Sequence, residues 1–215
     1  MVKLVIFDLD GTLIDSLEDL GTAINVSLEK MGLPTHKMEK FNYYVGNGIK
    51  RLCERSVGEH LDRAEELYTL FGEYYGSHYA VYTKPYSHIE EVLNRLKADG
   101  IKIAVASNKA ENFVVKIVTE LFPNITFDSI KGQTDTRDKK PCPDIIFQTM
   151  EELGVSKQDT ILVGDSNVDI QTSKNADIPS IGCLWGFRDY QELHQAGATK
   201  IVAEPLELID AIESM

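Results

Sequence analysis

The sequence predicts an α/β fold: a doubly wound parallel sheet with an all-helical segment inserted into it. Short apolar runs recur along the chain, and segments with helical periodicity separate them. These runs are mostly continuous rather than alternating, which is typical of strands buried on both faces of a parallel sheet. One long stretch shows helical periodicity alone. At 215 residues, the chain is long enough for a core domain with a smaller insert.

The strands of the sheet are expected at five apolar runs: Leu4 to Phe7, Ile101 to Ala106, Phe127 to Ile130, Ile161 to Val163 and Ser180 to Leu184. Helices are expected from Ser87 to Asp99 before Gly100, from Glu111 to Leu121 before Pro123, and from Glu204 to Met215. Strands that alternate with helices form a sheet whose ligands bind at the carboxyl ends of the strands.

The inserted segment runs from Asp15 to Lys84 and contains no convincing strand. It begins with Ser16-Leu17-Glu18-Asp19, which resembles a capping box, and the helix that follows should end near Gly32. Eight of the nine tyrosines lie in or beside this segment, and we expect them to form a small aromatic core. The predicted domains are therefore a core of residues 1–14 and 85–215 and a helical insert of residues 15–84.

Charge narrows the range of partners. Lys and Arg number 22 against 34 Asp and Glu, a formal net charge of −12, so we expect neither nucleic acid nor a membrane as partner. An anionic small molecule needs local positive charge from a metal, a lysine or a helix N-terminus. Three widely spaced cysteines and the lack of a long apolar stretch near the start favour the reducing cytoplasm.

Polar residues follow the predicted strands at four places: 8–12 (DLDGT), 107–109 (SNK), 139–144 (KKPCPD) and 164–169 (GDSNVD). Each alone is a common turn or helix cap, but together they should meet at one edge of the sheet. Asp8, Asp10, Asp165 and Asp169 would then repel each other unless a cation lay among them. Oxygen ligands without His or Cys select a hard cation, and a site shared with phosphate favours Mg²⁺.

These four segments together resemble the four-motif signature of the haloacid dehalogenase superfamily, and the resemblance spans the whole chain. It implies a Rossmann-like core, and it identifies residues 15–84 as the helical cap of that family. Only a helix and a strand fit between Ser107 and Lys140, so the larger cap type of some relatives has no room.

The resemblance also implies roles for the acidic residues. Asp8 maps to the nucleophile that forms an aspartyl-phosphate, and Asp10 to the general acid and base. Their spacing places both carboxylates on one side of an extended backbone. The metal is expected to bind the Asp8 and Asp165 carboxylates and the main-chain carbonyl of Asp10. Asp169 is expected either to contact these ligands without touching the metal or to bind the metal through water.

The remaining motif residues map to phosphate binding. Gly11 and Thr12 shape the turn, Ser107 donates its hydroxyl, and Asn108 donates its main-chain N–H at a helix start. Lys140 offsets the charge of the nucleophile and of the phosphoryl group, with Lys109 and Lys139 as neighbouring candidates. Dehalogenases of the superfamily lack an aspartate two residues after the nucleophile, so Asp10 favours phosphoryl transfer.

Substrate choice is expected in the insert, at the turn Gly46-Asn47-Gly48 that precedes Lys50 and Arg51. Its free N–H groups could bind an anion, although a solvated turn between helices explains the pattern equally well. With the segment from Trp185 to Arg188, this turn is similar to that of phosphoglycolate phosphatases.

The predicted function is magnesium-dependent hydrolysis of a small phosphomonoester, with 2-phosphoglycolate as one candidate, by a monomer or homodimer. The alternatives are a phosphosugar mutase resembling β-phosphoglucomutase and a phosphatase for another sugar phosphate, a nucleotide or pyrophosphate. A non-catalytic module that keeps the scaffold is a third, disfavoured by the intact Asp8, Asp10, Lys140 and Asp165.

Overall fold

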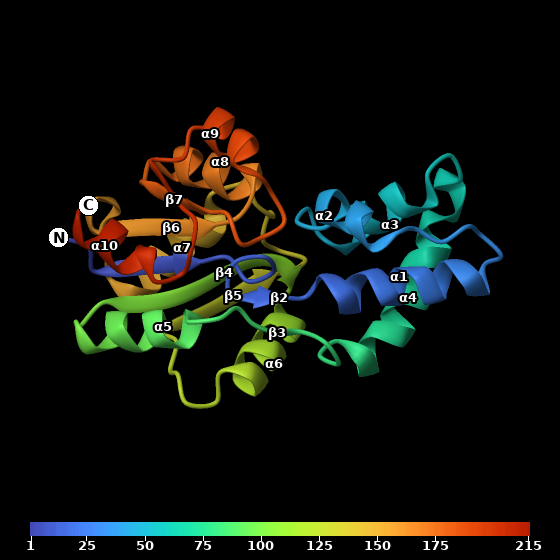
Figure 1. Cartoon of the computed structure of the whole chain (residues 1–215), viewed down its shortest axis with the longest axis horizontal. Helices are drawn as coiled ribbons and strands as arrows, with labels where there is room; N and C mark the ends of the chain where they lie inside the picture. Colours follow the sequence, from blue (N-terminus) through green and yellow to red (C-terminus); the bar gives the residue numbers. More distant parts are fainter.

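The computed structural model describes all 215 residues and shows a sheet-based core beside a separate group of helices (Figure 1). The six strands of the core are all parallel and lie in the order β5-β4-β1-β6-β7-β8. Their bounds are β1 Leu4–Phe7, β4 Lys102–Ala110, β5 Ser129–Gln133, β6 Thr160–Gly164, β7 Ser180–Cys183 and β8 Lys200–Val202. The predicted α/β fold with a Rossmann-like parallel sheet is confirmed.

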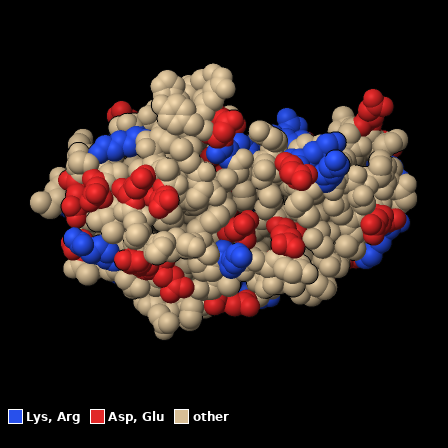
Figure 2. Space-filling view, in the orientation of Figure 1, with Lys and Arg blue, Asp and Glu red and all other residues tan.

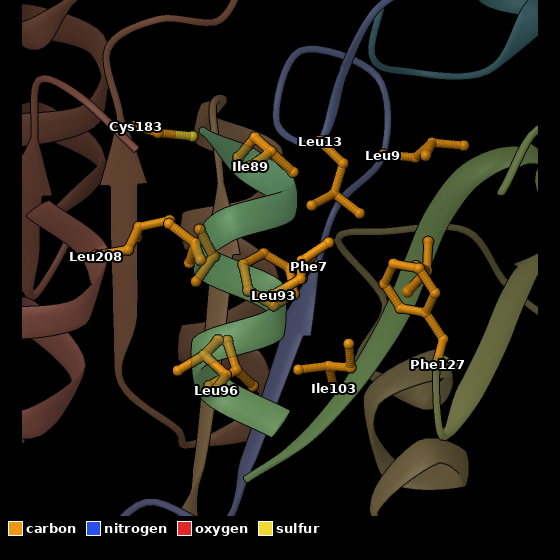
Figure 3. Close-up of a cluster of buried hydrophobic side chains, with 14 of the residues drawn as sticks. Phe7, Leu9, Leu13, Ile89, Leu93, Leu96, Ile103, Phe127, Cys183 and Leu208 are labelled. Carbon is orange, nitrogen blue, oxygen red and sulfur yellow. The ribbon is translucent and has the colours of Figure 1, made fainter. Parts of the chain in front are cut away.

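Strand β1 lies inside the sheet and is fully buried, because each of its residues packs on one of the two covered faces. Val5 and Phe7 belong to the larger apolar cluster, to which helices α5 (Ile89–Ala98), α6 (Glu111–Leu121) and α10 (Glu207–Glu213) contribute. Leu4 and Ile6 pack on the opposite face with α7 (Asp144–Leu153) and α8 (Asn167–Ala176). Figure 3 shows Ile89, Leu93 and Leu96 of α5 facing Phe7 and Ile103.

The second group of helices comprises α1 (Leu17–Lys30), α2 (Phe41–Tyr44), α3 (Ile49–Val57) and α4 (Ala64–His78). It has an apolar cluster of its own, built around side chains such as Leu20, Ile24, Phe41, Leu52 and Phe71. Of the tyrosines expected there, Tyr75 is buried, whereas Tyr43, Tyr68 and Tyr82 are exposed. The expected aromatic core is thus mostly aliphatic, with several tyrosine rings at its surface.

Two strands that the sequence did not indicate connect the core to these helices. β2 (Ile14–Asp15) pairs antiparallel with β3 (Lys84–Pro85), so the outgoing and returning segments run side by side. Asp19 of α1 strengthens the link, because its carboxylate accepts hydrogen bonds from the main-chain N–H and the hydroxyl of Thr83. The expected capping box at Ser16 is therefore wrong: the Ser16 hydroxyl donates to Asp10, and Asp19 binds the returning segment.

Strand β4 is longer than predicted, and the sequence analysis missed β8. β4 continues through Ser107 and Asn108 to Ala110 across an irregularity in its pairing with β5. β8 is three residues long and only partly buried, too short for a clear apolar run. Helix α9 (Tyr190–Ala196) follows β7. No helix has the length and apolar character needed to span a membrane. Acidic and basic side chains are interspersed over the face shown in Figure 2.

Candidate active site

The carboxyl ends of β1, β4 and β6, with the loop that precedes α7, bring the predicted polar segments together. Asp8, Asp10, Lys140, Asp165 and Asp169 are all buried. Asp8 and Asp10 follow β1, Asp165 follows β6, and Asp169 lies in the first turn of α8. Parallel strands end at the same edge, which explains why residues more than 150 positions apart meet here.

Lys140 lies between two carboxylates. Its Nζ is 2.8 Å from Asp8 Oδ1 and donates a hydrogen bond of 2.7 Å to Asp169 Oδ1. The contact with Asp8 is an ion pair without hydrogen-bond geometry, and Asp8 Oδ1 accepts no hydrogen bond from the chain. The other oxygen of Asp169 accepts from the hydroxyl of Ser166 at 2.7 Å and from its main-chain N–H at 3.2 Å. Both oxygens of Asp169 are therefore engaged within the protein. Asp8 Oδ1 accepts no hydrogen bond and Asp165 Oδ1 accepts only a long one of 3.5 Å, so these two oxygens are freer to bind a ligand.

Asp8 and Asp165 are harder to ionise than ordinary carboxyl groups. Burial raises the pKa of Asp8 to about 7, although Lys140 acts in the opposite direction. Burial, and then the charges of Asp169 and Asp8, also raise the pKa of Asp165 well above its ordinary value. Ligand oxygens of Asp8, Asp165 and Asp169 lie within 4.8 Å of one another. Such a set of close, buried oxygen donors fits a hard divalent cation, which would offset their repulsion.

Asp10 has different partners, both on its Oδ1 atom. Lys109 Nζ donates to it at 2.8 Å and the Ser16 hydroxyl at 2.6 Å, whereas Oδ2 receives no hydrogen bond from the chain. Burial alone would lower the pKa of Lys109, but Asp10 and Tyr75 together raise it above its ordinary value. The sequence analysis named Lys109 only as a neighbour of the other lysines and did not find Ser16. The two residues fix the Asp10 carboxylate with one oxygen free.

Two glycines allow the loops to approach Asp165. Gly11 has φ +89°, and a Cβ atom there would lie 2.5 Å from Asp165 Oδ2. A Cβ on Gly186, in the loop after β7, would collide with the carbonyl oxygen of Gly11 and with Asp165. That loop also provides the main-chain N–H of Phe187, which donates to Asp165 Oδ2 at 2.8 Å. The Thr12 hydroxyl makes only a long hydrogen bond of 3.5 Å to Asp165 Oδ1.

The expectation that Asn108 lies at a helix start is wrong, because β4 continues past it and α6 begins only at Glu111. Its side chain instead holds the Lys140 loop: Oδ1 accepts from the main-chain N–H of Lys140 at 2.7 Å, and Nδ2 donates to the Lys140 carbonyl at 3.0 Å. The Ser107 hydroxyl accepts from the main-chain N–H of Lys109 at 3.3 Å. Both residues contact the segments that carry the lysines.

The turn before α3 covers this site. Gly46 and Gly48 line a cavity of about 30 Å³ together with Asp8, Asp10 and Lys109, room for little more than a water molecule. Three successive carbonyls of the turn accept hydrogen bonds from the core: Val45 from Arg188 (2.9 Å), Gly46 from Asn108 (3.2 Å) and Asn47 from Lys139 (3.2 Å). The helical insert is thus docked on the core through this turn.

Lys50 and Arg51, which follow the turn, do not line that cavity. Lys50 Nζ lies 3.9 Å from a Glu65 carboxylate oxygen, and Arg51 donates to Glu54 at 2.6 Å; all four side chains are largely exposed. The structure therefore brings the glycines of the turn to the carboxylates but leaves its two basic residues at the surface of the insert.

The raised pKa of Asp165 predicts that Asp165→Asn stabilises the metal-free protein. A carboxyl whose pKa is higher in the folded state makes a stabilising contribution at low pH that is lost as the pH rises from the ordinary carboxyl range. At pH 8 the variant should have a higher free energy of unfolding than the wild type, and the difference should be smaller at pH 5. Urea unfolding in EDTA at both pH values measures this, with Asp177→Asn, whose side chain is exposed, as control. A variant less stable than the wild type at pH 8 would contradict the repulsion inferred here.

Comparison with known proteins identifies the relatives of this chain. The model of the family described as haloacid dehalogenase-like hydrolase matches residues 5–183. A phosphoglycolate phosphatase of Aquifex aeolicus is 36% identical over 186 residues, 86% of this chain and 86% of that protein. A phosphoglycolate phosphatase of Neisseria meningitidis is 35% identical over 205 residues, 93% of this chain and 87% of that protein. The crystal structure of a predicted phosphatase from Clostridium acetobutylicum superposes with a TM-score of 0.91 at 30% identity and full coverage of both chains.

Proposed function

The chain belongs to the haloacid dehalogenase-like hydrolase family, and we propose that it is a magnesium-dependent phosphatase that hydrolyses a small phosphomonoester through an aspartyl-phosphate on Asp8. The observation that carries this proposal is the pair of carboxylates after β1 with different partners. Asp8 lies beside Lys140 and the possible cation ligands, whereas Asp10 is held by Lys109 and Ser16 with one oxygen free. One group is therefore placed for attack and the other for proton transfer.

In the first step, an Asp8 carboxylate oxygen forms a bond to phosphorus as the bond from phosphorus to the ester oxygen breaks. A protonated Asp10 gives its proton to the departing oxygen, which leaves as an alcohol. In the second step, Asp10 takes a proton from a water molecule, which attacks phosphorus and releases Asp8 and inorganic phosphate. Lys140 stabilises the negative charge on the transferring group in both steps.

The metal would be held by the carboxylates of Asp8 and Asp165 and the main-chain carbonyl of Asp10. Asp169, whose two oxygens both accept hydrogen bonds, would not bind the metal directly. It would instead hold Lys140 and Ser166 in position beside the metal site. When bound, Mg²⁺ supplies positive charge that allows Asp8 to ionise beside an anionic substrate. This assignment explains how a carboxyl with a pKa near 7 can act as a nucleophile at neutral pH.

We assign residues 15–84 the role of the cap, because their Gly46-Asn47-Gly48 turn closes over Asp8 and Asp10. A substrate must enter when this turn lifts from the core, and the small volume beneath it favours a small ester. 2-Phosphoglycolate is the first substrate to test, since relatives that are 36% and 35% identical are phosphoglycolate phosphatases. A small phosphorylated metabolite of the cytoplasm would fit this site, because Lys140 and a bound cation would supply the positive charge that the acidic chain otherwise lacks.

Removal of the metal tests the proposal directly. In Mg²⁺ the protein should release inorganic phosphate from 2-phosphoglycolate or another small phosphomonoester, and EDTA should reduce the rate by at least about 10³-fold. Added Mg²⁺ should restore the rate. It should also raise the melting temperature of the wild type but not that of Asp165→Asn, a readout independent of turnover.

Two results would contradict this proposal. Phosphate release that EDTA does not affect would exclude the metal, and no release from any phosphomonoester by folded protein in Mg²⁺ would exclude the phosphatase. Formation of a sugar phosphate isomer, stimulated by a sugar bisphosphate and without free phosphate, would instead indicate the mutase.

A further inference from the structure

Arg188 is a buried cation between the core and the cap that the proposed catalytic steps do not use. It lies in the loop after β7 and is 9% exposed. Its Nη2 donates to the Val45 carbonyl at 2.9 Å, its Nε lies 3.3 Å from Glu192 Oε1, and its Cζ lies 5.6 Å from the centre of the Tyr43 ring. Arg188 thus contacts the cap at the turn that covers Asp8 and Asp10.

The third nitrogen of this guanidinium group, Nη1, is buried and has no hydrogen-bond partner in the chain. A buried donor without an acceptor costs free energy, so native proteins retain one mainly where another group binds it. Glu192 does not supply that acceptor: it lies on the Nε side, and its Oε1 also accepts from the main-chain N–H of Asn167 at 3.2 Å. Arg188 therefore has an unused donor.

A second guanidinium group lies close by. Arg55 of α3 donates from Nη1 to the carbonyls of Tyr43 and Tyr44, at 3.0 and 2.9 Å. Burial, and then the charge of Arg188, lower the pKa of Arg55, as expected for two cations near each other. Both arginines line a groove of about 840 Å³ between the cap and helices α8 and α9. Asp189 and Glu192 also line this groove, so the two arginines give it no surplus of positive charge. The feature that points to an anion is the Nη1 donor of Arg188, which neither carboxylate accepts from.

This groove borders the proposed active site. Val45 and Gly46 line the cavity that contains Asp8 and Asp10, and Arg188 Nη2 lies 3.6 Å from the position of a Cβ atom on Gly46. On the other side, Phe187, the residue before Arg188, donates its main-chain N–H to Asp165. The guanidinium group is therefore separated from the carboxylates only by the cap turn and one residue of the loop.

We infer that Arg188 binds a second anionic group of the substrate, a carboxylate or a second phosphate, while the phosphoryl group lies at Asp8. This inference rests on the proposed phosphatase function and narrows it to phosphomonoesters with a charged far end. The planar guanidinium group can hold Val45, Glu192 and an anion at once through donors that point in different directions. A substrate with that second charge would stabilise the closed position of the cap turn, and a neutral ester would not.

The experiment compares three esters in Mg²⁺: 2-phosphoglycolate, 1,3-propanediol bisphosphate and 2-hydroxyethyl phosphate, whose far end is neutral. For the wild type, kcat/KM should be higher for at least one ester with a charged end. Arg188→Met should lower kcat/KM for that ester by about 10- to 100-fold, mainly through KM. For the neutral ester the loss should be about threefold, from the missing hydrogen bond to Val45. Arg188→Lys should recover part of the kcat/KM lost for the charged ester, because lysine keeps the positive charge but lacks the several fixed N–H donors of the guanidinium group.

Arg95→Met, which removes the same charge from the exposed surface of α5, is the matched control. The anionic ester whose rate falls more identifies the second group as carboxylate or phosphate. An equal loss for neutral and charged esters would overturn the inference, because Arg188 would then only dock the cap. A wild type that hydrolyses all three esters equally well would overturn it too, while the phosphatase proposal would stand. A wild type that hydrolyses no ester would remove both.

Discussion

Asp8→Asn is expected to abolish phosphate release, with a fall in kcat of about 10⁴-fold or more. The amide is nearly the same size as the carboxylate, but it is a poor nucleophile. The variant should also fold at least as well as the wild type, because burial raises the pKa of Asp8 to about 7 even though Lys140 lies beside it, so the ionised group is costly in the metal-free protein. Steady-state phosphate release and thermal unfolding, measured on one preparation, check both parts.

The matched control for this variant is Asp177→Asn, at an exposed position that already has left-handed backbone with φ +57° and suits asparagine. Phosphate release by Asp177→Asn should equal that of the wild type. If Asp8→Asn kept more than about one hundredth of wild-type kcat, the nucleophile would have to be another group, since loss of a nucleophile costs far more. Trapping of a phosphorylated wild-type protein that is absent from Asp8→Asn would locate the covalent intermediate.

Lys140→Met is expected to reduce kcat by about 10³-fold and also to destabilise the protein by about 3–5 kcal/mol. Lys140 is 2% exposed and contacts both Asp8 and Asp169, so its loss leaves two buried carboxyl groups without their cation. Lys157→Met, which removes a surface lysine 3.8 Å from Asp177, should change neither quantity appreciably.

A double variant separates the two effects. In Lys140→Met/Asp169→Asn one of the two unpaired carboxylates is removed as well, so about 2 kcal/mol of the lost free energy of unfolding should return. Activity should not return, because the charge that stabilises the transferring phosphoryl group is still absent. Recovery of both stability and activity would show that Lys140 acts only as a structural partner of Asp169.

The sheet was the most predictable part of the molecule, because its signals are local. The run Leu4 to Phe7 has no polar residue, and the structure buries it completely. The other four predicted strands also exist, with shifts of one to several residues at their ends. β8, β2 and β3 escaped prediction because strands of two or three residues contain too few positions for a period to show.

The capping box at Ser16 and the helix start at Asn108 were wrong for a common reason. Both are short motifs whose side chains can bond to their own backbone or to a distant group. Ser16 bonds to Asp10, and Asn108 to both Lys140 and Gly46. The choice between local and distant partners depends on what the fold brings near, and no neighbouring residue in the sequence encodes it.

The sequence by itself determined the positions of the four polar segments at strand ends, and hence the edge of the sheet where Asp8, Asp10, Lys140 and Asp165 meet. Only the tertiary structure decided which cation serves which carboxylate: Lys140 contacts Asp8 and Asp169, whereas Lys109 holds Asp10. It also decided that Arg188, far along the chain, meets the cap turn at Val45. Strand ends follow from local apolar patterns, but such pairings form across 29 to 143 residues of sequence and depend on the packing of whole domains.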